Sequence, residues 1–303
     1  MTTETLESYV DAMRDASSVI SQINPDYLVA PMLGSIPFID AMAIVDSDFD
    51  FSKVIYMPAS SRIKDIKNVI KNWYYNFLKD VVDSPFYFPR VLGIDEVVSG
   101  LSVTRCFRSI DLASSRLSRE IKQILVEKLH SNDLEESLQA LRDGDILTEN
   151  QYSDRFSLIR ERLIKGTYRE HRDLAKQDTA LFLEAITSWL DSKLKYKTVG
   201  IEDSKIDKRQ KEYEKIKGQG RIIPIGIQTI LTMDNPDFSP ARLERLNGNG
   251  KTSYVQFSPV VQDFKITKQY VDFLSSLASY VGKDLSKVSP VNMGAILDSS
   301  KYL

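Results

Sequence analysis

Two adjacent carboxylates, Asp95 and Glu96, are the side chains whose type and spacing best suit chemistry in this sequence. Carboxylates accept hydrogen bonds from vicinal hydroxyl groups, or hold a divalent cation through water. The apolar run 91–94 predicts a buried strand that the two acids end, and the small residues at 99–102 begin a predicted helix, whose first amides can hold a phosphate. The pattern therefore suits a sugar phosphate. An acidic strand end followed by an ordinary helix start is the alternative interpretation.

This segment resembles the ribose-phosphate signature of the type I phosphoribosyltransferases, in which an apolar strand leads to two acids, a short loop with Gly and Ser or Thr, and a helix. The resemblance implies that Asp95 and Glu96 are catalytic and face the ribose hydroxyls of phosphoribosyl pyrophosphate. It also implies that the residues after them bind the 5-phosphate. These residues are Val97, Val98, Ser99, Gly100, Leu101 and Ser102. Three residues separate Glu96 from Gly100, where the family usually has four, so the loop is shortened.

Two further segments match the family by position. The family places a pyrophosphate-binding loop after its first core strand, and here the predicted strand 27–30 has such a position. The matching loop residues are Met32, Leu33, Gly34 and Ser35. Gly34 has no Cβ and lets backbone amides approach a ligand closely. A mobile loop over the pyrophosphate follows the second strand of the family, and Arg62 and Lys64 are suitable counter-charges there. An ordinary strand-to-helix connection and a solvated helix face are the alternatives.

The resemblance implies Mg²⁺ as cofactor, bound together with phosphoribosyl pyrophosphate. The expected metal ligands are Asp95, Glu96 and Asp234, the last because an acid after the final strand lies near the ligand in some family members. The two histidines, His130 and His171, lie in charge-rich helical sequence without a supporting motif. We therefore expect carboxylates and backbone amides, rather than histidine, to carry any chemistry.

The fold class expected from the pattern is α/β, with a parallel sheet of the phosphoribosyltransferase type and helices on both faces. Pro224 in the last predicted strand favours a position at a sheet edge. Ligands of such sheets bind beyond the carboxyl ends of the strands, where the candidate residues above would lie. The strands are expected at 27–30, 54–57, 91–94, 197–201 and 222–231.

We expect residues 1–109 and 194–240 to form this phosphoribosyltransferase-like core. Helical periodicity over 110–193 predicts a helical insertion, which could be an oligomerisation surface, a lid or a docking site for a protein partner. Residues 241–303 would be a C-terminal extension that packs on the core. The mixed-charge stretch 202–220 is interpreted as a solvated helix or mobile loop, with a basic flap over phosphate as the alternative.

Composition sets limits on function. The 303 residues are 42% hydrophobic and 27% charged, with a net charge of -2, as in ordinary soluble globular proteins. This charge gives no strong indication of a nucleic-acid partner. The single cysteine, Cys106, excludes an internal disulfide. No apolar run is long enough to span a membrane, and the first residues are unlike a signal peptide, so the expected location is the cytoplasm without membrane association.

Three functional hypotheses follow. The first is a phosphoribosyltransferase, a pentosyltransferase that transfers the phosphoribosyl group to a nitrogenous acceptor and releases pyrophosphate. Its oxocarbenium-like transition state needs mainly well-placed charge. The second is a catalytically diverged module that senses a nucleotide, or acts as a scaffold, and recruits a protein partner through 110–193. The third is a nucleoside or nucleotide hydrolase that uses the same acids. No motif identifies the acceptor.

Overall fold

The chain divides into two compact units in the computed structural model. The first comprises Met1–Phe77, Pro89–Ala113 and Tyr196–Leu303, and the second comprises Leu78–Phe88 and Ser114–Lys195. The residues that the structure describes are 2–32, 34–59, 65–83, 87–129, 186–231, 241–243, 264–266, 268–284 and 300–302, with a few single residues between 158 and 184.

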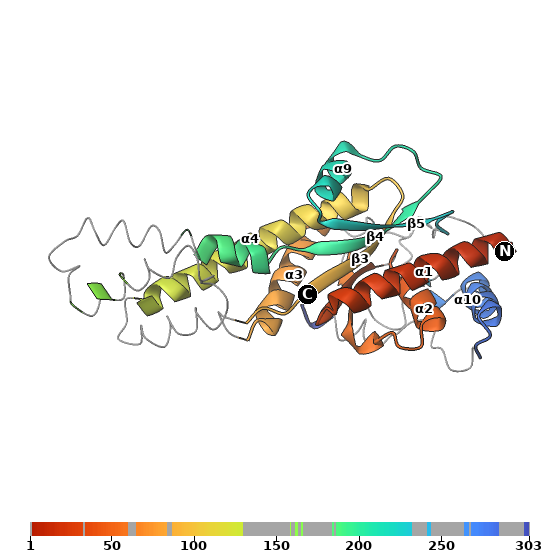
Figure 1. Ribbon diagram of the computed structural model, residues 1–303, viewed down its shortest axis with the longest axis horizontal. Helices are drawn as coiled ribbons and strands as arrows, with labels where there is room; N and C mark the ends of the chain where they lie inside the picture. The colour runs from red at the N-terminus through yellow and green to blue at the C-terminus, as the bar shows by residue number, and fades with distance from the viewer. Residues whose placement is uncertain are drawn as a thin grey trace, which may run out of the picture. The chain divides into compact units, whose positions relative to one another are not determined.

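A five-stranded sheet lies at the centre of the first unit (Figure 1). Its strands are β1 (Tyr27–Met32), β2 (Val54–Pro58), β3 (Val91–Val97), β4 (Lys197–Asp203) and β5 (Ile222–Ile227). The order across the sheet is β2-β1-β3-β4-β5, and every neighbouring pair is parallel. The predicted α/β class with a parallel sheet is therefore confirmed. Pro224 does lie on an edge strand, because β5 pairs with β4 alone in this sheet.

The central strand is longer than the sequence analysis predicted. Asp95, Glu96 and Val97 each pair with a residue of β4, so the prediction that the two acids end the strand is wrong. The apolar run 91–94 predicts only the first part of the strand, because backbone pairing with β4 continues for three more residues. The acids therefore lie within a hydrogen-bonded ladder, where successive side chains point to opposite faces.

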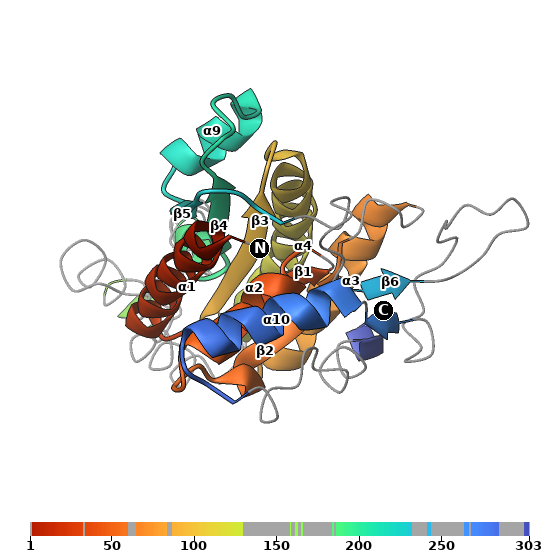
Figure 2. The same ribbon diagram turned by 90° about the vertical axis from the view of Figure 1, so that its right-hand side faces the viewer.

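Three helices pack together on one face of the sheet (Figures 1 and 2). They are α1 (Thr3–Ile23), α2 (Ile36–Val45) and α10 (Lys268–Tyr280). The amphipathic α1 begins at Thr2, whose side-chain oxygen accepts a hydrogen bond of 3.2 Å from the Thr5 amide. In contrast, nearly every residue of α2 is buried, including the charged Asp40.

Asp40 links α2 to α10. Its carboxylate accepts a hydrogen bond from the hydroxyl of Tyr270 on α10, and the exposed fraction of Asp40 is 0%. Burial raises the pKa of Asp40 well above its ordinary value, and the Tyr270 hydrogen bond offsets only part of that rise. A carboxyl group in such a place needs a donor, because an unpaired buried charge is strongly unfavourable.

The other face of the sheet carries α3 (Ile66–Val81), the first part of α4 (Leu101–Leu129) and α9 (Lys211–Gly218). Tyr196, just before β4, joins the first two of these helices to the sheet. Its ring lies 5.7 Å from that of Tyr74 on α3 and 5.2 Å from that of Phe107 on α4. Such edge-to-face pairs add to the hydrophobic stabilisation of a core.

Shorter elements complete the described chain. They are the 3-10 helices η1 (Phe51–Lys53) and η4 (Ser300–Tyr302), and the antiparallel pair β6 (Ala241–Leu243) and β7 (Phe264–Ile266). None of the helices in the part of the chain that the structure describes is both long enough and apolar enough to cross a membrane.

The second unit is described over the later part of α4 and the helical segment 186–193, among other short stretches. Here Lys122 Nζ donates a hydrogen bond of 2.7 Å to Thr187 Oγ1, and the rings of Phe88 and Trp189 meet edge to face at 5.1 Å. Most of the predicted helical insertion lies outside the described residues, so the insertion and its use for a partner stay predictions.

Gly93 in β3 gives a test of this packing. A Cβ at Gly93 would lie 1.8 Å from Tyr196 Oη and 2.8 Å from Thr198 Oγ1, closer than atoms can approach. We expect Gly93→Ala to lower the free energy of unfolding by about 1–3 kcal/mol, measured by chemical denaturation, because overpacking forces neighbours apart. Gly226→Ala is the matched control, since the nearest atom there, Ser204 Oγ, is 3.5 Å away. Equal unfolding midpoints for the two variants would contradict the described packing.

Candidate functional site

The carboxyl edge of the sheet brings the loop after β1 into contact with β3. A Cβ added at Gly34 would lie 2.5 Å from both Cδ and Oε1 of Glu96, so the Glu96 side chain rests directly on this glycine. The approach requires a residue without a side chain at position 34. Two of the predicted binding segments, 32–35 and 95–102, are thus in contact in the structure.

The two candidate carboxylates point to opposite faces of the sheet. Glu96 lies on the face of α1 and α2, beside Gly34. Tyr9 of α1 also lies near it: burial raises the pKa of Tyr9, and the Glu96 carboxylate adds to the rise. Asp95 lies on the opposite face, near Cys106 of α4. Burial raises the pKa of the Cys106 thiol, and the Asp95 carboxylate adds to the rise. A ligand on one face of β3 therefore does not meet both acids side by side.

Asp95 is enclosed in the protein. Its exposed fraction is 5%, and its Oδ1 accepts a hydrogen bond of 2.9 Å from the amide of Glu96. Burial raises the pKa of Asp95 well above the ordinary value, and the neighbouring Glu96 carboxylate raises it further. Because the charged form is disfavoured, Asp95 is poorly suited to hold a cation or to act as a base near its ordinary pKa.

The loop after β3 packs against α9. Gly100 has φ +79°, and a Cβ there would lie 2.7 Å from the ring of Tyr213. The amide of Gln210, at the start of α9, donates a hydrogen bond of 3.1 Å to the carbonyl of Ser99. Glycine at position 100 thus satisfies both the left-handed backbone and the close approach of an aromatic ring.

The start of α4 uses part of this loop for its own capping. Ser99 Oγ accepts a hydrogen bond of 3.4 Å from the amide of Leu101, and Thr104 Oγ1 donates one of 2.7 Å to the carbonyl of Gly100. Leu101 and Ser102 are exposed. The first turn of any helix has amides without partners inside the helix, so this end of α4 can attract an anion.

Glu202 at the end of β4 anchors α9. Its Oε1 accepts hydrogen bonds of 2.6 Å from Tyr213 Oη and 2.7 Å from Lys217 Nζ, and Arg209 lies 3.5 Å from its other oxygen. Burial alone would raise the pKa of Glu202. The hydrogen bonds from Lys217 and Tyr213 outweigh burial, so the pKa lies below the ordinary value. Two cations and a hydroxyl on one carboxylate make this a strong local interaction.

Asp203, next to Glu202, organises the loops after β4 and β5. Its Oδ1 accepts a hydrogen bond of 2.9 Å from the Lys205 amide, and its Oδ2 accepts one of 3.0 Å from the Ile230 amide. The predicted site residues do not include these two acids. A signal was present, since Gly200-Ile201-Glu202-Asp203 repeats the order Gly-Ile-acid-acid of residues 93–96.

The other predicted binding residues are placed as follows. Met32 ends β1, and Ser35 is buried, with its hydroxyl donating to the carbonyl of Pro31. The remaining residues lie outside the described part of the chain, so their predicted roles stay predictions. They are Leu33, Arg62, Lys64 and Asp234.

The described residues bring together no cluster of metal-binding side chains. No group of three or more His, Cys, Asp or Glu side chains that could hold a metal ion occurs among them. Asp95 and Glu96, the expected pair of ligands, face opposite sides of β3, and burial raises the pKa of Asp95. The predicted binding of Mg²⁺ by the pair is therefore not supported by the donor set.

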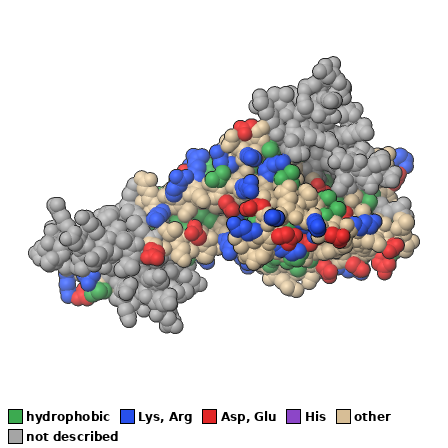
Figure 3. Space-filling view, turned by 90° about the horizontal axis from the view of Figure 1, so that it is seen from above, with side chains coloured by type: hydrophobic (Ala, Val, Ile, Leu, Met, Phe, Trp, Pro, Cys, Tyr) green, Lys and Arg blue, Asp and Glu red, His purple; other side chains and the backbone are tan. Residues whose placement is uncertain are grey.

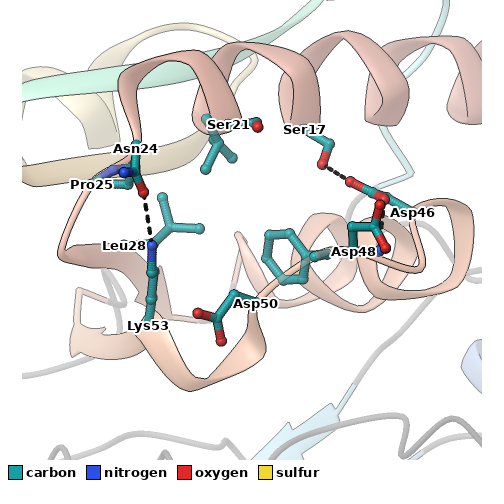
Figure 4. Close-up of a pocket in the computed structure, with 11 residues that line it drawn as sticks. Ser17, Ser21, Asn24, Pro25, Leu28, Asp46, Asp48, Asp50 and Lys53 are labelled. Carbon is teal, nitrogen blue, oxygen red and sulfur yellow. Dashed lines mark hydrogen bonds between the residues drawn. The ribbon is translucent and has the colours of Figure 1, made fainter.

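A pocket of about 230 Å³ lies at the amino edge of the sheet, away from the predicted site. Figure 4 shows its lining between the end of α1, the start of β1 and the segment that follows α2. Ser17 donates a hydrogen bond to Asp46, and Lys53 donates one of 3.1 Å to Asn24. None of the pocket residues is among those expected to bind a ligand.

Comparison of the chain with models of protein families, with curated proteins and with solved structures found no match in any of the three.

Asp95→Asn should have a pH-dependent effect on stability. The folded-state pKa of Asp95 lies above its ordinary value of 3.8, so the native protein loses stability relative to the neutral variant as pH rises from about 4. Denaturation at several pH values should show that the free energy of unfolding of the variant rises relative to that of the native protein. The rise should be at most about 1.4 kcal/mol per pH unit and should stop at the folded-state pKa. Exposed Asp11→Asn is the matched control for charge. A difference in the free energy of unfolding between variant and native protein that does not change with pH would contradict the burial of the Asp95 carboxyl group.

Glu202→Gln should show the opposite dependence. The folded-state pKa of Glu202 lies below 4.5, so its ionised form stabilises the fold above that pH, and the contribution disappears as pH falls through the folded-state pKa. At pH 7 we expect the variant to lose roughly 2 kcal/mol, because hydrogen bonds to a charged group are lost. Tyr213→Phe, which removes one of them, should lose less. A Glu202→Gln variant as stable as the native protein at pH 7 would exclude the anchoring role.

Proposed function

We propose that the carboxyl edge of β1 and β3 binds a ribose phosphate, and that phosphoribosyl pyrophosphate is the ligand it suits best. The observation that carries this proposal is the contact of Glu96 with Gly34. It joins the loop after β1 to the strand that leads into the N-terminus of α4. Ligands of open parallel sheets bind at this edge, outside the carboxyl ends of the strands.

The strand order supports a sheet of the phosphoribosyltransferase type. In the resemblance described above, the pyrophosphate loop follows the first core strand and the ribose-phosphate loop follows the acidic strand. A ligand that spans both loops needs these strands to be close together. Here β1 and β3 are direct neighbours in the sheet, with β2 on the far side of β1.

In this proposal Glu96 accepts hydrogen bonds from the ribose hydroxyls. Residues 97–102 and the amides at the start of α4 hold the 5-phosphate, where the helix dipole favours negative charge. Residues 32–35 approach the pyrophosphate, and Arg62 and Lys64 supply counter-charge. The ion Mg²⁺ would arrive with the pyrophosphate of the ligand, as is usual for magnesium with phosphate substrates, rather than be bound by the protein alone.

Asp95 takes a different role from the one the sequence suggested. It is buried on the opposite face and accepts the amide hydrogen of Glu96. We assign it as a positioning residue that fixes the backbone at Glu96. Transfer to a nitrogen nucleophile would then depend on Glu96 and on backbone amides, which stabilise developing charge without a proton transfer from Asp95.

Binding without turnover is the second candidate function. It is favoured by the burial of Asp95 on the face away from Glu96, which separates the two expected carboxylates, and by the packing of Tyr213 on the shortened loop at Gly100. In that case the edge would sense phosphoribosyl pyrophosphate or a nucleotide and pass the signal to a partner.

Calorimetry with phosphoribosyl pyrophosphate and Mg²⁺ tests the proposal. We expect saturable binding by the full chain, and at least tenfold weaker binding by Glu96→Gln, because hydrogen bonds from the ribose hydroxyls to a charged carboxylate are lost. Glu7→Gln, on the exposed surface of α1, has the same charge change and should bind as the native protein does.

A pyrophosphate-release assay with a panel of nucleobases and amines separates the two candidate functions. Release that depends on an acceptor supports the transferase, whereas binding without release supports the sensing module. Absence of binding of phosphoribosyl pyrophosphate and of nucleotides to the native protein would reject both.

A further inference from the structure

A cationic surface lies beside the candidate site, on the segment between β4 and the end of α9. Residues 204–218 contain six Lys and Arg against three Asp and Glu, although the whole chain has a net charge of -2. We call this surface, together with the start of α4, the α9 face. Its defining residues are Arg105, Arg108, Lys205, Lys208, Lys211 and Lys215.

Helix geometry directs two of these lysines outward. The buried side of α9 is formed by Tyr213 and Ile216, so Lys211 and Lys215, which are exposed, lie on the outward side. Four residues of helix span about 6 Å, which places the two ammonium groups one above the other on neighbouring turns. The side of the molecule seen in Figure 3 carries several clusters of Lys and Arg atoms, with acids between them.

The start of α4 extends the α9 face toward the loop at Ser99. Arg108 on α4 lies 3.9 Å from Glu212 on α9, which brings the two helices together. Arg105 lies one turn earlier, nearer to Ser102. The Arg108 side chain is 65% exposed despite this contact, so it can bind a further anion.

The lysines of the α9 face are exposed and have no ion pair with a described residue. Arg209 and Lys217 both pair with Glu202. In contrast, no ion pair is found for Lys205, Lys208, Lys211 or Lys215 with any residue that the structure describes, and all four are exposed. Their charge is therefore available to a partner in solution.

We infer that the α9 face binds the sugar–phosphate backbone of a nucleic acid. Lysine and arginine side chains on one exposed surface neutralise successive phosphates, and arginine can do so with two parallel hydrogen bonds. The inference is independent of the proposed function, since it needs no pocket and no reaction. Failure to bind phosphoribosyl pyrophosphate would leave it unchanged.

The side chains of the α9 face argue against two other polyanionic partners, an acidic protein and an anionic membrane. Protein interfaces have an apolar core, and interfacial helices bury an apolar side in the membrane. Within the described stretch 202–220 no large hydrophobic side chain is exposed. Leu101 and Leu112 are exposed on α4, at 47% and 61%, but two separate leucines do not make an apolar core.

Fluorescence anisotropy with a labelled single-stranded oligonucleotide of about 20 nucleotides, as DNA and as RNA, tests the inference. At 50 mM salt we expect the full chain to bind with a Kd below about 100 µM, and the affinity to fall steeply as salt is raised. Lys211→Glu with Lys215→Glu should weaken binding at least tenfold. It should also reduce the slope of log K against log salt by about 1.4, since two phosphate contacts are lost.

Arg14→Glu with Lys268→Glu is the matched control. It makes the same change in net charge on α1 and α10, where both side chains are exposed, at 64% and 84%. This control should stay within about threefold of the native protein. Lys211→Gln with Lys215→Gln, which avoids new negative charge, should show a smaller loss in the same direction and guards against misfolding of the first variant.

Three results would overturn the inference. The first is absence of binding by the native protein at 50 mM salt. The second is an equal loss in the two charge-reversal variants, which would show that only net charge matters. The third is binding of polyglutamate as tight as that of the oligonucleotide, which would indicate an acidic protein partner instead.

Discussion

The backbone pairing of β3 on both sides is the constraint on which the candidate site depends. β1 and β4 flank β3 in parallel, so the loops after all three strands leave the sheet at one edge. The same pairing determines which face each side chain takes. A shift of one residue in register would exchange Asp95 and Glu96, placing the buried acid against Gly34 and the other among the core residues of α4.

Asp95 and Glu202 show how strongly the surroundings determine what a carboxylate can do. Both are buried on the face of the sheet that α4 and α9 cover. Glu202 has Lys217, Arg209 and Tyr213 around it, and its pKa is lowered, so it remains charged and holds α9 in place. Asp95 lies near Cys106 and Tyr196, and burial raises its pKa. Glu202 therefore anchors a helix through ion pairs, whereas Asp95 holds the backbone amide of Glu96 through a hydrogen bond.

Local pattern predicted the sheet well and the site only in part. The first four strands were readable because short apolar runs ended at acids, prolines or glycines, and Pro224 indicated the edge. The fifth strand ends at Ile227, before the end of the apolar run 222–231 that predicted it. The orientation of Asp95 and Glu96 was missed because polar residues were taken to end β3, whereas pairing with β4 continues through them. The contacts of Glu202 with Tyr213 and Lys217 join residues 11 and 15 positions apart, and residues 202–220 were interpreted mainly as a solvated segment.

The hydrogen bond between Tyr270 and Asp40 joins two segments that are far apart in the sequence. The apolar α2 follows the strand and loop that end at Gly34, but the hydroxyl that satisfies its buried acid is 230 residues further along. Closing so long a loop costs conformational entropy, which the burial of α2 against α10 has to offset. A truncation before α10 would therefore leave a buried acid of α2 without its donor and part of an apolar helix exposed.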